Sequence, residues 1–245
     1  MEVHHHPEVE KKGFKEYILE GLMIFLAVMM GFFAESIREH IADKHRENEY
    51  MASMVEDLKS DTATQSKIIS YAKVQNAMID SLIQLLSSPD FKGSGNSVYY
   101  FARNISIPER AFYNDRTIQQ LKSSGSLRLI SKADISNHIM AYDQKVREQY
   151  FDMADGETLR QSYRQLAVKI FDTKVFNTMQ QGDKIIRPAN NPRLFSSDPA
   201  LLNAYIGSAQ YLKKFNEVSA KKSAGLLVQA IQLIREIKEQ YQLEK

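Results

Sequence analysis

The chain predicts an all-α protein in which one N-terminal transmembrane helix continues into a long stalk helix, followed by an antiparallel bundle of long helices. Three observations predict this fold: one uninterrupted apolar segment, long stretches with apolar residues every three or four positions, and no segment with the alternation of a strand. The expected parts are a polar tail at 1–16, the transmembrane helix at 17–36, the stalk and first bundle helix at 37–87, and the bundle domain at 97–245.

The composition is that of a folded protein, with 43% hydrophobic and 25% charged residues. Lys and Arg number 32 and Asp and Glu number 30, a balance that argues against nucleic acid as a partner. There is no cysteine, which excludes disulfides, thiolate metal sites and cysteine nucleophiles.

The apolar segment at 17–34 reads YILEGLMIFLAVMMGFFA and has no polar face for water. Its uncharged core, 21–34, is short, but extension to Tyr17 gives about 18 residues and a length near 27 Å, enough to cross a thin bilayer. Glu20 and Glu35 then lie at the two headgroup layers. The segment therefore predicts a single-pass membrane protein whose surroundings include membrane lipid.

A cleaved signal peptide is the alternative, with the lysines at 11–15 as its basic region and the small-x-small sequence at 34–36 as its cleavage site. The helical pattern continues into Ile37 and Ile41, which favours an uncleaved signal anchor. Basic residues are equally numerous on both sides, so the clustered lysines of the short tail decide the orientation. We expect an inner-membrane protein with its C-terminal domain in the periplasm.

Ala27, Gly31 and Ala34 share one face of the membrane helix, an arrangement that lets two membrane helices approach closely. It predicts a homo-oligomer interface, although small residues are also common in membrane helices for other reasons. The tract His4 to His6 has no defined ligand geometry, so a solvated tail or a purification remnant is favoured over a metal site.

Residues 36–86 contain no Pro or Gly and keep helical apolar spacing, which predicts one long helix. Asp61, Gln65 and Gln75 interrupt its stripe, so a strong two-stranded coiled coil is not expected. The sequences SSPD at 87–90 and GSGN at 93–96 end this helix.

Residues 97–130 are less regular and aromatic. One interpretation is a partner or ligand surface, and the other is a pair of short helices whose aromatic side chains cap the bundle. The residues of the first interpretation are Tyr99, Tyr100, Arg103, Arg110, Phe112, Tyr113 and Arg116.

A helical turn at 117–124 is expected to end at Gly125 in the left-handed conformation, and the next helix to begin at an N-cap Ser131 with Asp134 as its partner. That helix keeps one apolar face to about residue 170, with a bend expected at Gly156.

Residues 173–197 predict a long connection with a short helix near Phe176 and no strand. Asp198 as N-cap and Pro199 at the first helical position then start the last helix, which runs nearly to the C-terminus. Three long helices with one apolar stripe each are expected to pack together, and a fourth helix from another protomer would complete their thin core.

The sequence LKSSGSLRLI at 121–130, within 112–144, resembles a domain of unknown function in uncharacterised single-span membrane proteins of Bacteroidota. Residues 13–40 resemble the anchor of these proteins, and SDPALLNAYI at 197–206 is similar to the start of their last helix. The resemblance implies the same topology and brings no catalytic residues with it.

Catalytic motifs are missing from the sequence: HExxH, GxSxG, the Walker loop and GxGxxG do not occur. His138 is expected as a partly buried helix residue, and His40 and His45 lie five apart, which is wrong for one metal-binding face. We therefore expect no catalytic residues, no metal and no cofactor.

The leading function hypothesis is a non-enzymatic oligomeric or scaffold subunit of an envelope membrane complex, with other membrane proteins or its own copies as partners. The alternatives are an extracytoplasmic sensory or ligand-binding bundle, and an oligomeric channel with Glu20 and Glu35 as charged rings.

Overall fold

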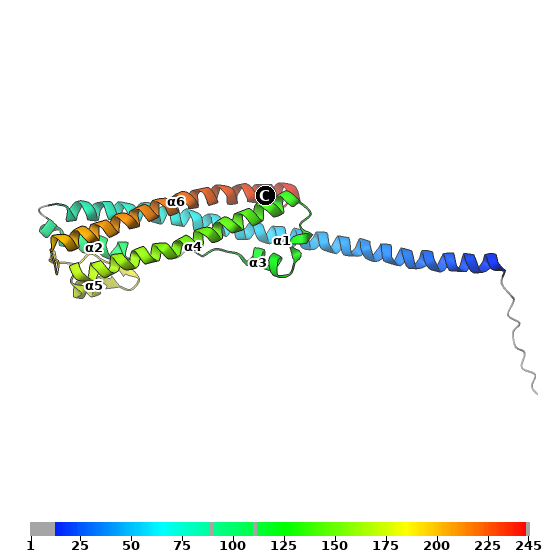
Figure 1. Ribbon diagram of the computed structural model, residues 1–245, viewed down its shortest axis with the longest axis horizontal. Coiled ribbons are helices and arrows are strands. Elements are labelled where there is room, and N and C mark those ends of the chain that lie inside the picture. The colour runs from blue at the N-terminus through cyan, green and yellow to red at the C-terminus, as the bar shows by residue number, and fades with distance from the viewer. Residues whose placement is uncertain (1–12, 89–90, 110–111, 244–245) are drawn as a thin grey trace, which may run out of the picture. The chain divides into compact units, whose positions relative to one another are not determined.

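The computed structural model describes residues 13–88, 91–109 and 112–243, and these are almost wholly helical (Figure 1). The helices are α1 (Phe14–Leu86), α2 (Gly95–Ile105), α3 (Arg116–Ser123), α4 (Ala133–Ile170), α5 (Thr173–Thr178) and α6 (Pro199–Tyr241), with 3-10 turns η1 (Phe91–Ser94) and η2 (Ser126–Leu129). Strands β1 (Gln180–Gln181) and β2 (Lys184–Ile185) form a small antiparallel hairpin. The predicted all-α class is confirmed, and the expectation of no strand is wrong for this hairpin, whose turn contains Gly182 at φ 56°.

Two compact units divide the chain, Met1–Glu49 and Tyr50–Lys245, and their boundary falls inside the unbroken helix α1. In the part of the chain that the structure describes, α1 is the helix long and apolar enough to cross a membrane. Its most apolar 18-residue window has a mean hydropathy of 2.0 and none of it is buried. Phe25, Phe32 and Phe33, for example, are 58%, 68% and 63% exposed. Burial within this chain therefore does not explain the apolar character of the segment.

The second unit is a bundle in which α4 and α6 pack along the part of α1 that begins at Tyr50 (Figure 1). Its core consists of two hydrophobic clusters. We call the end of the bundle where α1 enters at Tyr50 the entry end, and the end where α1 stops the far end. The entry-end cluster includes Met51, Leu58, Ile139, Leu233 and Ile237, and the far-end cluster includes Ile79, Leu82, Tyr163, Tyr205 and Leu212.

The side-chain pairs between helices show the helix directions. Tyr142 of α4 bonds to Asp61 of α1, and Gln65 of α1 bonds to Gln149 further along α4, so α1 and α4 run in the same direction.

Helix α6 runs in the opposite direction, because Asn216 bonds to Asn76 and the earlier Lys213 pairs with the later Asp80. Both α1 and α4 are therefore antiparallel to α6.

The parallel pair follows from the long connection between α1 and α4, which returns along the bundle from the far end to the entry end. On this path the Tyr71 hydroxyl donates to the Ile107 carbonyl at 2.6 Å, and Arg116 reaches Asp57 near the start of the bundle. A connection of this length allows parallel neighbours, whereas short loops join antiparallel ones.

Several predicted boundaries are confirmed. Helix α1 ends at Leu86, Gly125 is left-handed at φ 68°, and the Asp198 carboxylate accepts the Leu201 N–H at 2.9 Å with Pro199 starting α6. The expectation for Ser131 is wrong: α4 begins at Ala133, and the cap position is Lys132, which is extended and makes no side-chain cap bond.

The expected bend between two helices at Gly156 is not found, because α4 runs as one helix from Ala133 to Ile170. The glycine instead makes room for the ring of Phe215: a Cβ at position 156 would lie 2.3 Å from the Phe215 Cζ atom. Close packing of α4 against α6 therefore explains this glycine.

Candidate functional site: a buried carboxylate cluster and a polar cavity

Three carboxylates are buried at the entry end of the bundle, on the helix faces that carry the hydrophobic core. Asp57 and Asp61 lie on α1 and Asp143 lies on α4, and each is 2% exposed or less. We call them the carboxylate cluster. Buried carboxylates require hydrogen-bond or ion-pair partners, and those of this cluster come largely from the connection at 113–122.

The Asp57 carboxylate accepts hydrogen bonds from the first residues of α3. Its Oδ2 accepts the Thr117 backbone N–H at 2.9 Å, and its Oδ1 accepts the Arg116 Nη2–H at 2.7 Å. The residue before α3, Asp115, makes no side-chain cap bond. A carboxylate sixty positions earlier in the chain therefore satisfies the N-terminal donor and balances the positive end of the helix dipole.

The Asp143 carboxylate binds side chains from both ends of the segment 113–122. It accepts from the Lys122 ammonium at 2.5 Å, from the Tyr113 hydroxyl at 3.0 Å and from the Arg147 guanidinium. Burial, followed by the negative charge of Asp143, raises the pKa of the Tyr113 hydroxyl, which therefore keeps its proton and remains a donor.

Asp61 accepts the Asn114 N–H at 3.1 Å and the Tyr142 hydroxyl at 3.2 Å, and among the described residues it forms no ion pair. Burial raises the pKa of its carboxyl to about 6, and the charges of Asp57 and Asp115 raise it further against the two hydrogen bonds. The charge of the Asp61 carboxyl therefore changes near pH 6.

The carboxylate cluster leaves no space for a ligand. The cavity beside it, lined by Asp57, Asp61, Tyr113 and Asp143 among others, has a volume of about 10 Å³, which is at most one water molecule. Its chemistry is that of attachment: three carboxylates hold the segment 113–122 on α1 and α4.

A second polar region lies between the two hydrophobic clusters. Gln65 donates to Gln149 at 3.1 Å, and Gln149 donates to the Ser223 hydroxyl at 2.7 Å, which links α1, α4 and α6 in one buried chain. The Gln65 Oε1 atom is buried and has no hydrogen-bond partner among the described residues. Polar contacts of this kind fix the register of the three helices at some cost in stability.

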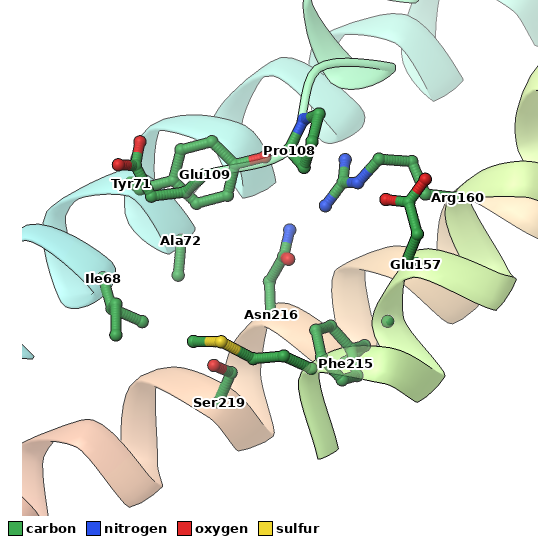
Figure 2. A pocket seen from close by; sticks show the side chains of 12 residues that line it. Ile68, Tyr71, Ala72, Pro108, Glu109, Glu157, Arg160, Phe215, Asn216 and Ser219 are labelled. Carbon is green, nitrogen blue, oxygen red and sulfur yellow. The ribbon is translucent and has the colours of Figure 1, made fainter. Parts of the chain in front are cut away.

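Beside this chain lies a cavity of about 70 Å³, large enough for about two water molecules (Figure 2). Figure 2 shows Arg160 and Glu157 on one side, Tyr71 and Glu109 on another, and Asn216 below them. Arg160 is 4% exposed, and its guanidinium donates to the Ile105 carbonyl at 2.5 Å.

The two carboxylates that line this cavity have cationic partners of their own: Glu109 pairs with Lys67 and Glu157 with Arg164, each at 2.6 Å. The arrangement is suited to holding ordered water between the helices.

The predicted partner or ligand surface is divided between the two ends. Tyr99 is fully buried in the far-end cluster, and Tyr100 and Arg103 lie on the same helix α2. Tyr113 and Arg116 bind the carboxylate cluster at the entry end.

Phe112 is 72% exposed, and Arg110 lies outside the described residues. The six described residues therefore do not form one surface, and none of them lines the cavity of Figure 2.

The predicted oligomer interface lies on the exposed part of α1. Ala27, Gly31 and Ala34 are exposed, and a Cβ on Gly31 would meet no atom within 4 Å. Glu35, one of the two glutamates of the channel hypothesis, pairs with Arg38 at 2.5 Å. The interface and the channel stay predictions.

Two of the described histidines, His45 and His138, contact a glutamate. His138 contacts Glu236 at 2.8 Å on the bundle surface and is 55% exposed at its side chain, so its expected partial burial is not found. His45 contacts Glu49 at 3.2 Å, and His4 to His6 lie outside the described residues. The described residues contain no group of three or more His, Cys, Asp or Glu side chains that could hold a metal ion.

Sequence reasoning did not single out the carboxylate cluster as a site. The available signal was the acidic interruption of an apolar stripe at Asp61, together with Asp57 four residues earlier on the same helix face. An acidic residue on a buried face needs a donor from another segment, which is what 113–122 supplies.

The fold and these polar regions define a class: a helical-bundle protein with one candidate membrane span and a charge-held connection between its long helices. Comparison with protein-family models, with curated proteins and with solved structures gives no match for this chain.

Proposed function

We propose that this chain is a non-enzymatic, single-pass membrane protein that serves as an oligomeric or scaffold subunit of an envelope membrane complex. The observation that carries the proposal is the exposed apolar segment of α1, whose most apolar window has none of its surface buried within the chain. Such a surface is stable in lipid or against other membrane helices. The bundle that follows supplies a folded body for contacts outside the bilayer.

The proposed location is the cytoplasmic membrane, with the bundle on the periplasmic side and the N-terminal segment uncleaved. The resemblance of residues 112–144 to single-span membrane proteins of Bacteroidota agrees with this location. Alkaline carbonate extraction of native membranes and the intact mass of the protein test it. We expect the full-length mass in the membrane pellet, and a mass shortened to begin near Glu35 would identify a cleaved signal peptide instead.

Self-association is proposed to use the face of Ala27, Gly31 and Ala34, where small residues allow two helices to approach closely. The test is native mass measurement and crosslinking of the full chain after purification in mild detergent, together with identification of co-purifying proteins. We expect an oligomer or a stable complex. A strict monomer with no associated protein would remove the scaffold proposal.

Gly31→Leu tests the face itself, because the larger side chain separates helices that meet at this position. Gly21→Leu is the matched control: Gly21 lies on a different face of the same helix, and a Cβ added there, like one added to Gly31, would meet no atom within 4 Å. We expect Gly31→Leu to give monomers and Gly21→Leu to leave the oligomer intact. Equal behaviour of the two variants would rule out this face.

A further inference from the structure

The basic residues of this chain are concentrated at one end of the bundle. Between Arg160 and Phe215 the sequence has nine Lys or Arg, three Asp and no Glu. The rest of the chain carries 23 Lys or Arg against 27 Asp or Glu, within totals of 32 and 30. Such a charge asymmetry inside a nearly neutral protein indicates a partner of opposite charge for the basic part.

The structure places most of these residues in one lobe at the far end, which we define as α2 together with residues 169–197 (Figure 1). Two acidic residues, Asp172 and Asp183, lie in this lobe. Its basic residues are Arg103, Lys169, Lys174, Lys184, Arg187 and Arg193.

The backbone of the far-end lobe is fixed by contacts between distant segments. Asn96 and Asn191 exchange two hydrogen bonds, each side chain accepting the backbone N–H of the other, at 3.1 and 2.7 Å. The Phe195 N–H donates to the Ile170 carbonyl at 2.8 Å. At Gly95, an added Cβ would lie 2.0 Å from the Pro192 carbonyl oxygen, so α2 and the loop are in close contact. The cations of the lobe are therefore held on a defined scaffold.

Most of the basic side chains in the lobe are exposed and form no ion pair with the described residues. They are Lys169, Lys174, Lys184 and Arg193. Arg187 is exposed as well and stacks over the Tyr100 ring at 4.4 Å, which leaves its charge at the surface.

Two exposed apolar side chains lie in or next to this lobe in the sequence. Phe195 is 77% exposed, and Val168, directly before Lys169, is 55% exposed. Exposed cations on several segments, with an exposed aromatic ring in the same lobe, suit a lipid surface. Such a surface attracts the cations through its potential without a shaped pocket and accepts the ring at its interface. A folded acidic partner would require matched positions for each charge instead.

We propose that the far-end lobe binds an anionic phospholipid surface. Lys174, Lys184 and Arg193 approach the lipid phosphates, and Phe195 inserts at the headgroup boundary. The bundle is thereby a body with a lipid contact at the end opposite to the entry of α1, in addition to the proposed N-terminal anchor.

The test uses the full chain held in nanodiscs of neutral phosphatidylcholine and mixed with vesicles, whose flotation measures capture. The vesicles contain either phosphatidylcholine alone or phosphatidylcholine with 30% phosphatidylglycerol. We expect capture by the anionic vesicles, its loss at high salt, and no capture by the neutral vesicles.

The decisive variant is Lys174→Glu with Lys184→Glu and Arg193→Glu. Each cation near an anionic surface contributes about a fivefold gain in partitioning, so the triple variant is expected to lower capture at least about 100-fold. The control is Lys145→Glu with Lys221→Glu and Arg235→Glu, which changes the net charge equally at exposed positions of α4 and α6 outside the lobe.

We expect the control to retain most of the capture, and Phe195→Ser to show a smaller loss than the far-end triple variant. Equal losses in the two triple variants would show a general charge effect and overturn the proposal. Capture that does not depend on phosphatidylglycerol would also overturn the proposal. A lack of capture by either kind of vesicle would overturn it too, and is the result expected if the lobe binds an acidic protein instead.

Discussion

The two ends of the bundle hold the returning connection by opposite means. At the entry end, the buried carboxylates Asp57 and Asp143 bind Arg116 and Lys122 of the connection. At the far end the partners are aromatic rings and backbone groups. Tyr99 packs edge-on against Phe171 with ring centroids 5.0 Å apart.

This difference explains where the free charge of the molecule lies. The entry end commits Arg116 and Lys122 to ion pairs with buried carboxylates, whereas the far end closes its core with apolar side chains and leaves most of its cations exposed. The entry end should therefore be sensitive to loss of single charges, and the far end to loss of single neutral contacts.

The strongest test of the comparison is Asp143→Ala. The substitution leaves the Lys122 ammonium and the Tyr113 hydroxyl without their shared acceptor in a largely buried position. Loss of one member of a buried pair is costly, and because Arg147 and Lys122 reach solvent in part, we expect a loss of about 3 kcal/mol in unfolding free energy. Urea unfolding of the full chain in neutral detergent, followed by circular dichroism, measures it.

Asp155→Ala is the control, because Asp155 is exposed on the same helix. A change within about 0.5 kcal/mol is expected there. If the two substitutions had equal effects, the cluster would not be what holds the connection at the entry end.

The counterpart at the far end is Tyr99→Phe, which keeps the ring and removes the hydroxyl. This hydroxyl accepts the Asp172 N–H at 2.8 Å and donates to the Arg193 carbonyl at 3.0 Å. Both backbone groups lose a partner, so we expect a loss of about 1–2 kcal/mol in the same unfolding measurement.

Tyr211→Phe, at a side chain that is 71% exposed, should leave the stability unchanged and serves as the control. A larger loss for Tyr99→Phe than for Asp143→Ala would reverse the comparison between the two ends.

The long helices and their ends could be predicted from local signals. The spacing of apolar residues gave α1, α4 and α6, and the side chain of Asp198 and the flexibility of Gly125 marked two boundaries through interactions within a few residues. Such signals depend on the neighbours of a residue in the chain, which a single sequence contains.

The connection between α1 and α4 depends on contacts that are distant in sequence. Asp57 meets Thr117 sixty positions later, and the space at Gly156 belongs to Phe215. Gly156 therefore suggested a bend, and the aromatic residues of 99–116 suggested one surface. The expectation for Gly156 was wrong because its partner lies on another helix, and the aromatic residues of 99–116 are divided between the two ends because their partners lie in different segments of the chain.

The third expected effect is a pH dependence at the entry end from Asp61, whose folded pKa is raised to about 6. A raised carboxyl pKa means that the folded state binds the proton more tightly than the unfolded state. Between the ordinary carboxyl pKa and about pH 6 this contribution therefore stabilises the fold as the pH falls, and it is lost as the pH rises. Asp61→Asn removes the titration while keeping an oxygen that accepts the Asn114 N–H.

We expect the unfolding free energy of Asp61→Asn, relative to that of the wild type, to be about 2 kcal/mol higher at pH 8 than at pH 4.5 in urea unfolding. Comparing the two proteins at each pH value removes the pH dependence that they share. Asp80→Asn, on the same helix as Asp61 and at an exposed pair with Lys213, is the control for an Asp-to-Asn change outside the carboxylate cluster. A pH-independent difference between Asp61→Asn and the wild type would mean that Tyr142 and Asn114 stabilise the charged form of Asp61 as well as water does, and would contradict the raised pKa.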